Sequence, residues 1–143
     1  MRFMAIVKAT KDSEAGVMPS EKLLADMGKF NEEMANAGVM VDGEGLLPSS
    51  NGARVRFNGA KRAVIDGPFP ETKELVAGFW ILECKSLDEA VEWMKRCPNP
   101  SGEEGEIELR QVFDADDFGD ALPPEERARE ERLRAQTESQ AKK

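Results

Sequence analysis

The sequence predicts one α+β domain, in which two helices cover one face of an antiparallel sheet and a β-hairpin is inserted between two of the strands. Apolar residues recur every two residues in some segments and every three or four in others. The resulting order is strand, helix, strand, hairpin, strand, helix, strand. The 143 residues suffice for one ordinary domain with a core and are too few for two.

The first strand is predicted over residues 2–9 and the first helix after a loop at 10–18. In the strand, four small or apolar residues share one face: Phe3, Ala5, Val7 and Ala9. Pro19 suits a first helical turn, and a stripe at spacings of three and four then runs down one side: Leu23, Met27, Phe30, Met34 and Ala37. Gly38 can end this helix in the left-handed conformation, before a second extended segment over 39–47.

The second half begins with a hairpin over 53–66, for which Asn58-Gly59 is the predicted turn. Residues 75–84 form a strand that is apolar on both faces, with Phe79 and Ile81 on one and Trp80 and Leu82 on the other. Ser86 to Glu89 is a capping-box pattern that opens a helix, stopped by Pro98. Its inward residues are expected to be Leu87, Ala90, Val91 and Met94. The last strand is predicted over 106–113.

Without the hairpin, this order is the ferredoxin-like split β-α-β arrangement, with both helices on one side of the sheet. The strand 75–84 still presents apolar residues, Trp80 included, to the uncovered side. In a monomer these residues would form an exposed patch. The sequence therefore predicts a homodimer that pairs through the sheet face.

Composition narrows the classes of partner. A net charge of -8 argues against direct nucleic-acid binding, which relies on clustered Lys and Arg. We expect no membrane span and no signal segment, because the apolar runs are short. Cys84 and Cys97 fit no metal or redox spacing, so a reducing cytoplasm is the expected compartment. The expected domain covers 1–113, and 114–143, with nine acidic and six basic residues, forms a charged helical or disordered tail.

The chain has neither histidine nor tyrosine, which removes the usual near-neutral base and the usual zinc ligand. No phosphate-binding glycine motif occurs either, so neither a metal nor a cofactor is predicted. Catalytic acids and bases would have to be carboxylates or lysines with shifted pKa values. The densest polar cluster is the loop 66–74, which Pro68 and Pro70 stiffen. Asp66 can serve there either as a structural turn residue or as a ligand contact.

The string Asp66-Gly67-Pro68-Phe69, followed by Glu71-Thr72-Lys73-Glu74, resembles the signature of the YCII-related family in its DGPF-motif branch. The resemblance covers residues 1 to about 113, with support from the segments 2–4, 37–46, 78–80 and 87–98. It implies a dimeric α+β barrel with a cleft between each sheet and the partner. Relatives elsewhere in the superfamily are linked to a His-Asp pair and to dehydrochlorination of a chlorinated hydroquinone. Because this chain has no histidine, that mechanism cannot be transferred to it as it stands. Bacterial members of the branch are often encoded near sigma factors.

Two functions follow as alternatives. In the first, a lyase or isomerase uses Asp66 or Glu44 for proton transfer and Lys73 to steady an anion. The predicted ligand contacts are Phe69, Glu71, Glu74 and Trp80. In the second, the same cleft serves a non-catalytic dimer that binds a small molecule or regulates sigma-factor-dependent transcription. A core role for Trp80 and a turn role for Glu44 are the structural alternatives.

Overall fold

The computed structural model describes residues 1–99 and 104–141, and the chain divides into two compact units, Met1–Val112 and Phe113–Lys143. The first unit holds six strands and three α-helices in its described part. Their bounds, in chain order, are β1 Arg2–Lys8, α1 Lys11–Glu14, α2 Glu21–Asn36, β2 Met40–Gly45, β3 Ala53–Asn58, β4 Lys61–Asp66, β5 Val76–Glu83, α3 Leu87–Lys95 and β6 Ile107–Gln111. Short 3-10 turns lie at Ser49–Asn51 and Thr72–Glu74.

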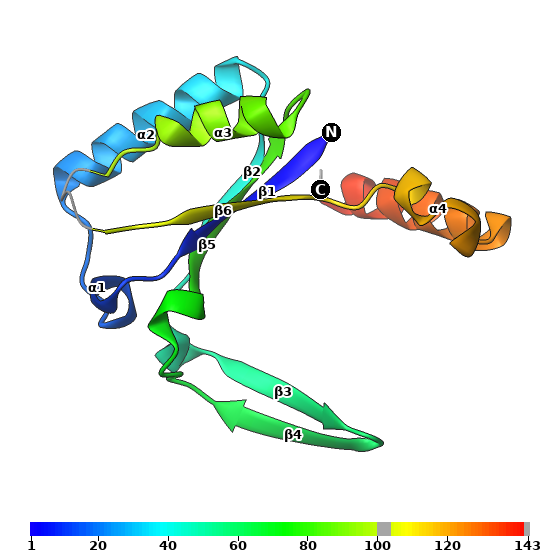
Figure 1. Cartoon of the computed structure of the whole chain (residues 1–143), viewed down its shortest axis with the longest axis horizontal. Helices are drawn as coiled ribbons and strands as arrows, with labels where there is room; N and C mark the ends of the chain where they lie inside the picture. The colour runs from blue at the N-terminus through cyan, green and yellow to red at the C-terminus, as the bar shows by residue number, and fades with distance from the viewer. Residues whose placement is uncertain (100–103, 142–143) are drawn as a thin grey trace. The chain divides into compact units, whose positions relative to one another are not determined.

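The main sheet has the strand order β2-β5-β1-β6, and every neighbouring pair is antiparallel. Strands β3 and β4 form a separate two-stranded sheet. Helices α2 and α3 lie on the same side of the main sheet (Figure 1). This is the predicted ferredoxin-like α+β arrangement with an inserted hairpin, and the fold prediction is confirmed.

The core lies between the main sheet and these two helices. Phe3 and Ala5 of β1 stand opposite Leu82 and Trp80 of β5 in register, so all four side chains point to the helix-covered face. Their partners on the helices are Phe30, Met34, Ala90 and Met94, all buried. Such a core forms because apolar residues recur every two positions along the strands and about every 3.6 positions along the helices, so that each element presents one apolar face. The sequence shows both patterns.

The prediction that Trp80 lies on the uncovered face is wrong. Its side chain is only 7% exposed, and its Nε1–H donates a hydrogen bond to Asn31 Oδ1 of α2 over 2.9 Å. Its ring meets Phe30 edge to face, with centroids 5.8 Å apart. The alternation along β5 assigns its residues to the correct two faces. Both faces are apolar, however, so alternation alone does not predict which one the helices cover.

Several local predictions also need correction. The segment 10–18 contains the short helix α1, which a Thr10–Ser13 capping box opens. Helix α2 starts two residues later than expected, at Glu21, because Ser20 Oγ caps it by accepting from the Leu23 amide. Leu87 was expected to point inward, yet it is 49% exposed because it occupies the first, outward turn of α3.

The hairpin turn is displaced by one residue from its predicted place. Asn58 pairs with Lys61, so the two turn residues are Gly59 and Ala60. Gly59 has a φ of 61°, in the region that glycine adopts readily, and placing it first in the turn satisfies that need.

The second unit contains a kinked 3-10 segment, Ala115–Ala121, and the helix α4, Pro124–Ala141. Phe113 and Phe118 stack with ring centroids 4.9 Å apart. No residue of α4 is buried, and its surface carries ion pairs such as Arg134 with Glu130 at 3.5 Å. The structure thus has a charged helix in the part of the chain for which the sequence left a helical or a disordered tail open. Over the described residues, no helix combines the length and apolarity needed to cross a membrane.

Candidate functional site

The face of the main sheet opposite the helices has an apolar centre. Met4 and Ile6 of β1 stand opposite Ile81 and Phe79 of β5 in register. All four side chains are half-buried, and we call them the apolar patch. The patch lies on two central strands because residues between the core-facing positions necessarily point the other way.

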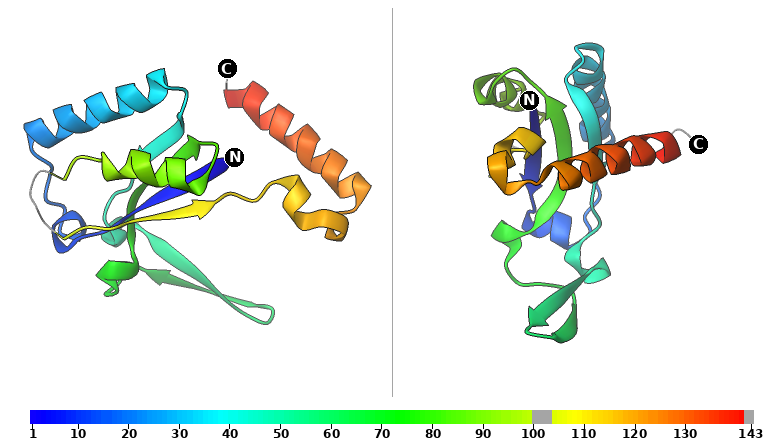
Figure 2. Two further views of the ribbon diagram at one scale, coloured as in Figure 1. Left: turned by 45° about the horizontal axis from the view of Figure 1, so that its top comes forward. Right: turned by 90° about the vertical axis from the view of Figure 1, so that its right-hand side faces the viewer.

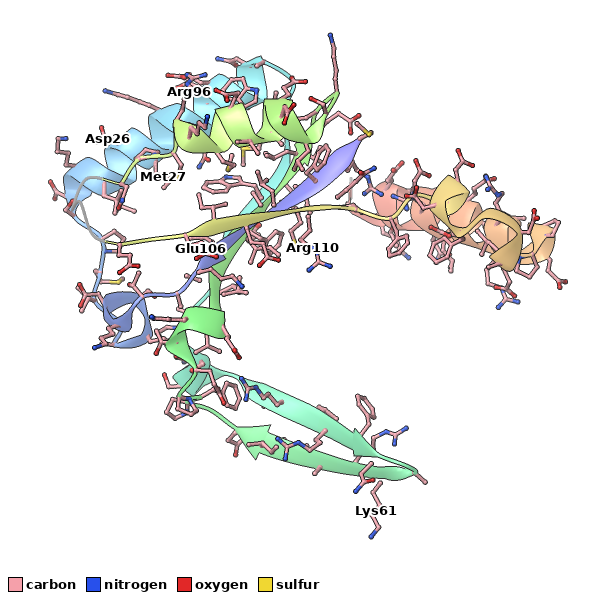
Figure 3. The ribbon with its side chains drawn as sticks, viewed as in Figure 1. Asp26, Met27, Lys61, Arg96, Glu106 and Arg110 are labelled. Carbon is pink, nitrogen blue, oxygen red and sulfur yellow. The ribbon has the colours of Figure 1, made fainter. Side chains whose placement is uncertain are left out.

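Charged side chains border the apolar patch. On the β6 side, Glu108 pairs with Lys8 at 3.5 Å and with Arg110 at 3.4 Å. Figure 3 shows Arg110 projecting from β6 on the side away from the helices. On the opposite side, Glu44 of β2 stands next to Phe79 in register and is exposed. The open face thus combines an apolar floor with charges of both signs at its margins.

The loop 66–74 is fixed at its start by the segment around Ser49. The Gly67 amide donates to the Gly52 carbonyl over 2.9 Å, and the Phe69 amide donates to Ser49 Oγ over 3.0 Å. Ser49 is itself bound to Glu14, which accepts from both its amide, at 2.9 Å, and its hydroxyl. A Cβ at Gly67 would lie 1.8 Å from the Ser49 carbonyl oxygen, so only glycine fits this close approach.

Arg54, the second residue of β3, ties the hairpin to the same loop. Its guanidinium lies 3.8 Å from the centre of the Phe69 ring and 3.3 Å from a carboxylate oxygen of Glu71. A stacked and ion-paired arginine is a well-ordered contact, although its exposure limits the gain in stability. Two of the predicted ligand contacts, Phe69 and Glu71, are therefore engaged by the chain itself.

The three predicted catalytic residues are not brought together by one chain. Asp66, Lys73 and Glu44 are exposed, and no hydrogen bond or ion pair links their side chains within the described residues. Glu74 is exposed as well. The carboxylate of Asp66 accepts no backbone N–H in the described chain, so the Asx-turn considered for it does not form. Trp80 lies on the far side of the sheet from the apolar patch.

Sequence reasoning missed the residues that hold this loop: Glu14, Ser49 and Arg54. Ser49 and Glu14 are 35 positions apart, and no local pattern predicts such a pair. A usable signal was Gly67 before Pro68, since glycine in a stiff loop often marks a close backbone approach.

Cys84 and Cys97 are free thiols, and the pKa of each is raised. Burial raises the pKa of the Cys84 thiol, and the nearby carboxylates of Glu89 and Glu83 raise it further. Burial also raises the pKa of Cys97. In the described part of the chain, no three acidic or cysteine side chains gather where they could hold a metal ion.

A raised pKa means less thiolate in the folded chain than in the unfolded chain at the same pH. We therefore expect Cys84 and Cys97 to react with a disulfide reagent at pH 8 at least about tenfold more slowly in the native protein than in urea. Absorbance of the released thiolate measures both rates. Equal rates in the two conditions would contradict the burial of these side chains.

The chain is similar to a protein family, to one further sequence and to one solved structure. Residues 1–116 match the model of the YCII-related domain. An uncharacterised protein of Rhizobium meliloti (strain 1021) is 32% identical over 92 residues, which are 64% of this chain and 74% of that protein. A solved 5-chloro-2-hydroxyhydroquinone dehydrochlorinase from Burkholderia phenoliruptrix AC1100, in complex with 2,5-dihydroxybenzoquinone, has 16% identity and a TM-score of 0.48, over 82% of this chain and 98% of the other. Because the family model matches most of its length, this chain belongs to the YCII-related family.

Proposed function

We propose that this protein forms a homodimer through the open face of its sheet and binds a small organic molecule between the two copies. The apolar patch carries this proposal, because α2 and α3 cover only the other face of the sheet (Figure 1). Apolar patches framed by polar residues are typical of interaction sites. A second copy is the favoured cover because a two-fold axis through the patch brings identical, self-complementary surfaces together.

The surroundings of the patch suggest the kind of molecule. Phe79 and Ile81 provide a flat apolar floor, while Glu44 and Arg110 stand at its margins. Binding sites for small molecules commonly combine such a floor with a few polar groups that fix orientation. We therefore infer a ligand with an aromatic or alicyclic body and one or two polar substituents. The segment Asp66-Gly67-Pro68-Phe69 supports assignment to the DGPF branch.

A lyase or isomerase activity is the second candidate, and Glu44 is the observation in its favour. Glu44 is the one predicted catalytic residue on the open face, next to Phe79, and its carboxylate has no hydrogen bond within the described residues. It could therefore transfer a proton to a molecule on the patch. Asp66 and Lys73 would have to act from the loop. We favour non-catalytic binding of a small molecule, with or without a regulatory role, because one chain does not bring the side chains of Asp66, Lys73 and Glu44 together.

A thermal-shift screen of small aromatic acids and alcohols tests the proposed binding. A ligand present at 100 times its Kd should stabilise the wild type by about 2.7 kcal/mol. The same ligand should stabilise Phe79→Ala much less, and turnover lost in Glu44→Gln with binding retained would favour the enzyme. Equal stabilisation of wild type, Asp66→Asn and Lys73→Ala would remove the loop from the site. Equal stabilisation of wild type and Phe79→Ala would refute binding on the patch.

Ile6→Asp tests the proposed dimer. Placing a charge at the centre of the patch in both copies should raise the dimer Kd by about a hundredfold or more, as measured by sedimentation equilibrium. The matched control is Leu24→Asp, since Leu24 is 58% exposed on α2 and lies away from the patch. Circular dichroism should show both variants folded. A dimer that tolerates Ile6→Asp as well as Leu24→Asp would place its interface elsewhere.

A further inference from the structure

The β3–β4 hairpin is a second apolar surface that its own chain leaves uncovered. All its residues except the half-buried Ile65 are exposed, and Val55, Phe57 and Val64 are 55%, 68% and 69% exposed. No hairpin residue belongs to the core cluster. A two-stranded hairpin is marginally stable in water unless a further surface supports it. We therefore expect another surface to pack against this arm.

The apolar residues share one face of the arm. Val55 stands opposite Val64, and Phe57 stands opposite Arg62, whose guanidinium lies 4.5 Å from the Phe57 ring centre. Lys61, on the other face, points away from the main sheet (Figure 3). Since neighbouring residues in a strand point to opposite faces, the face with Val55, Phe57 and Val64 is turned toward the side of the sheet that carries the apolar patch. We call it the inner face.

The base of the arm is held rigidly. The amide of Gly67 and the guanidinium of Arg54 bind the two strands to the neighbouring loops, through Gly52 and Glu71 respectively. Phe69 is bound to Ser49 in addition. The arm leaves the sheet on the side opposite α2 and α3 in both further views (Figure 2). These contacts fix the direction of the arm, so that its inner face does not pack against the core of its own chain.

The distribution of charge along the chain indicates which partner the arm contacts. The arm, residues 53–66, has four basic residues and one acidic residue, whereas the rest of the chain has 16 basic and 27 acidic residues. Of the basic residues only Arg62 lies on the face with Val55, Phe57 and Val64, and the other three lie on the opposite face. The charge of the arm as a whole therefore attracts a second copy of this acidic protein, while the apolar residues make the contact.

We propose that in the homodimer the β3–β4 arm of each subunit reaches over the other copy and packs its inner face against it. This inference rests on the proposed homodimer and adds that the partner, rather than the chain itself, covers Val55, Phe57 and Val64. It also gives the segment Asp66–Phe69 a role as the anchor that aims the arm. The site on the open sheet face would then be walled by a segment of the second subunit.

Photo-crosslinking tests the contact directly. The residue at 57 is replaced by p-benzoylphenylalanine, and irradiation should link two copies into a species of twice the chain mass. The matched control carries the same group at Lys61, on the outer face, where linking should be at least about tenfold weaker. A link within one chain, no link, or equal linking from both positions would overturn the proposal.

Phe57→Ser provides a second measurement that needs no crosslink. Its dimer Kd should rise by about tenfold or more, whereas Ala63→Ser on the outer face should leave Kd unchanged. An unchanged Kd for Phe57→Ser refutes the arm contact. If Ile6→Asp dissociates the dimer but position 57 does not link, the arm proposal fails and the sheet-face dimer stands. If position 57 links and Ile6→Asp has no effect, the sheet-face proposal fails instead.

Discussion

Gly67→Ala is expected to destabilise the protein by about 3 kcal/mol, measured by urea unfolding. The added Cβ would lie 1.8 Å from the Ser49 carbonyl oxygen and 2.7 Å from its carbonyl carbon. Both are backbone atoms, so no side-chain rotation can relieve the overlap. The loop would have to move away from Ser49, which breaks the hydrogen bond from the Phe69 amide to Ser49 Oγ and weakens the one from the Gly67 amide to the neighbouring Gly52 carbonyl.

Gly45→Ala is the matched control for this change. Gly45 lies at the end of β2, and a Cβ there meets nothing within 4 Å. Its free energy of unfolding should therefore change by less than about 1 kcal/mol. If the two variants were equally stable, the close packing of the loop against Ser49 would be disproved. Because the loop anchors the arm, Gly67→Ala should also weaken crosslinking from position 57.

Leu82→Ala is expected to cost about 3–5 kcal/mol of unfolding free energy. Leu82 is 0% exposed and stands at the centre of the core, opposite Phe3 and beneath the two helices. Truncation loses the burial of its side chain and leaves a cavity that rigid sheet neighbours cannot close. Urea unfolding followed by tryptophan fluorescence measures the loss, since Trp80 and Trp93 belong to or pack on the same cluster.

Leu24→Ala removes the same atoms from the exposed side of α2 and should change stability by less than about 0.5 kcal/mol. Comparable losses in the two leucine variants would contradict the assignment of Leu82 to the core. A selective loss at Leu82 would support the division of β5 into a helix-covered face and an open face, on which the proposed dimer depends.

The order of the elements could be predicted because it depends on local periods. The alternation in β1 and the three-and-four spacing in α2 both survive in the structure, with Phe3, Ala5, Phe30 and Met34 buried as expected. The side of the sheet on which Trp80 lies could not be predicted. Both faces of β5 are apolar, and the choice depends on Asn31 and Phe30, which contact Trp80 from a distant helix.

The candidate site was less accessible to sequence reasoning. The stiffness and crowding of the loop 66–74 were visible in its prolines, and Phe69 and Glu71 do make specific contacts. Those contacts are made with Arg54 of the hairpin, and Ser49 is held by Glu14, a pairing that depends on the whole fold. The roles of Asp66, Lys73 and Glu44 stay predictions, because a single chain does not bring their side chains together.

Sedimentation velocity of the full chain over a dilution series tests the central claim most directly. If a second copy covers the apolar patch, the protein should sediment at micromolar concentration as one species of twice the 15.8 kDa chain mass, and dissociate only on strong dilution. A single 15.8 kDa species that remains folded and soluble at every concentration would mean that Met4, Ile6, Phe79 and Ile81 face water in the native protein, and the proposed dimer would be refuted.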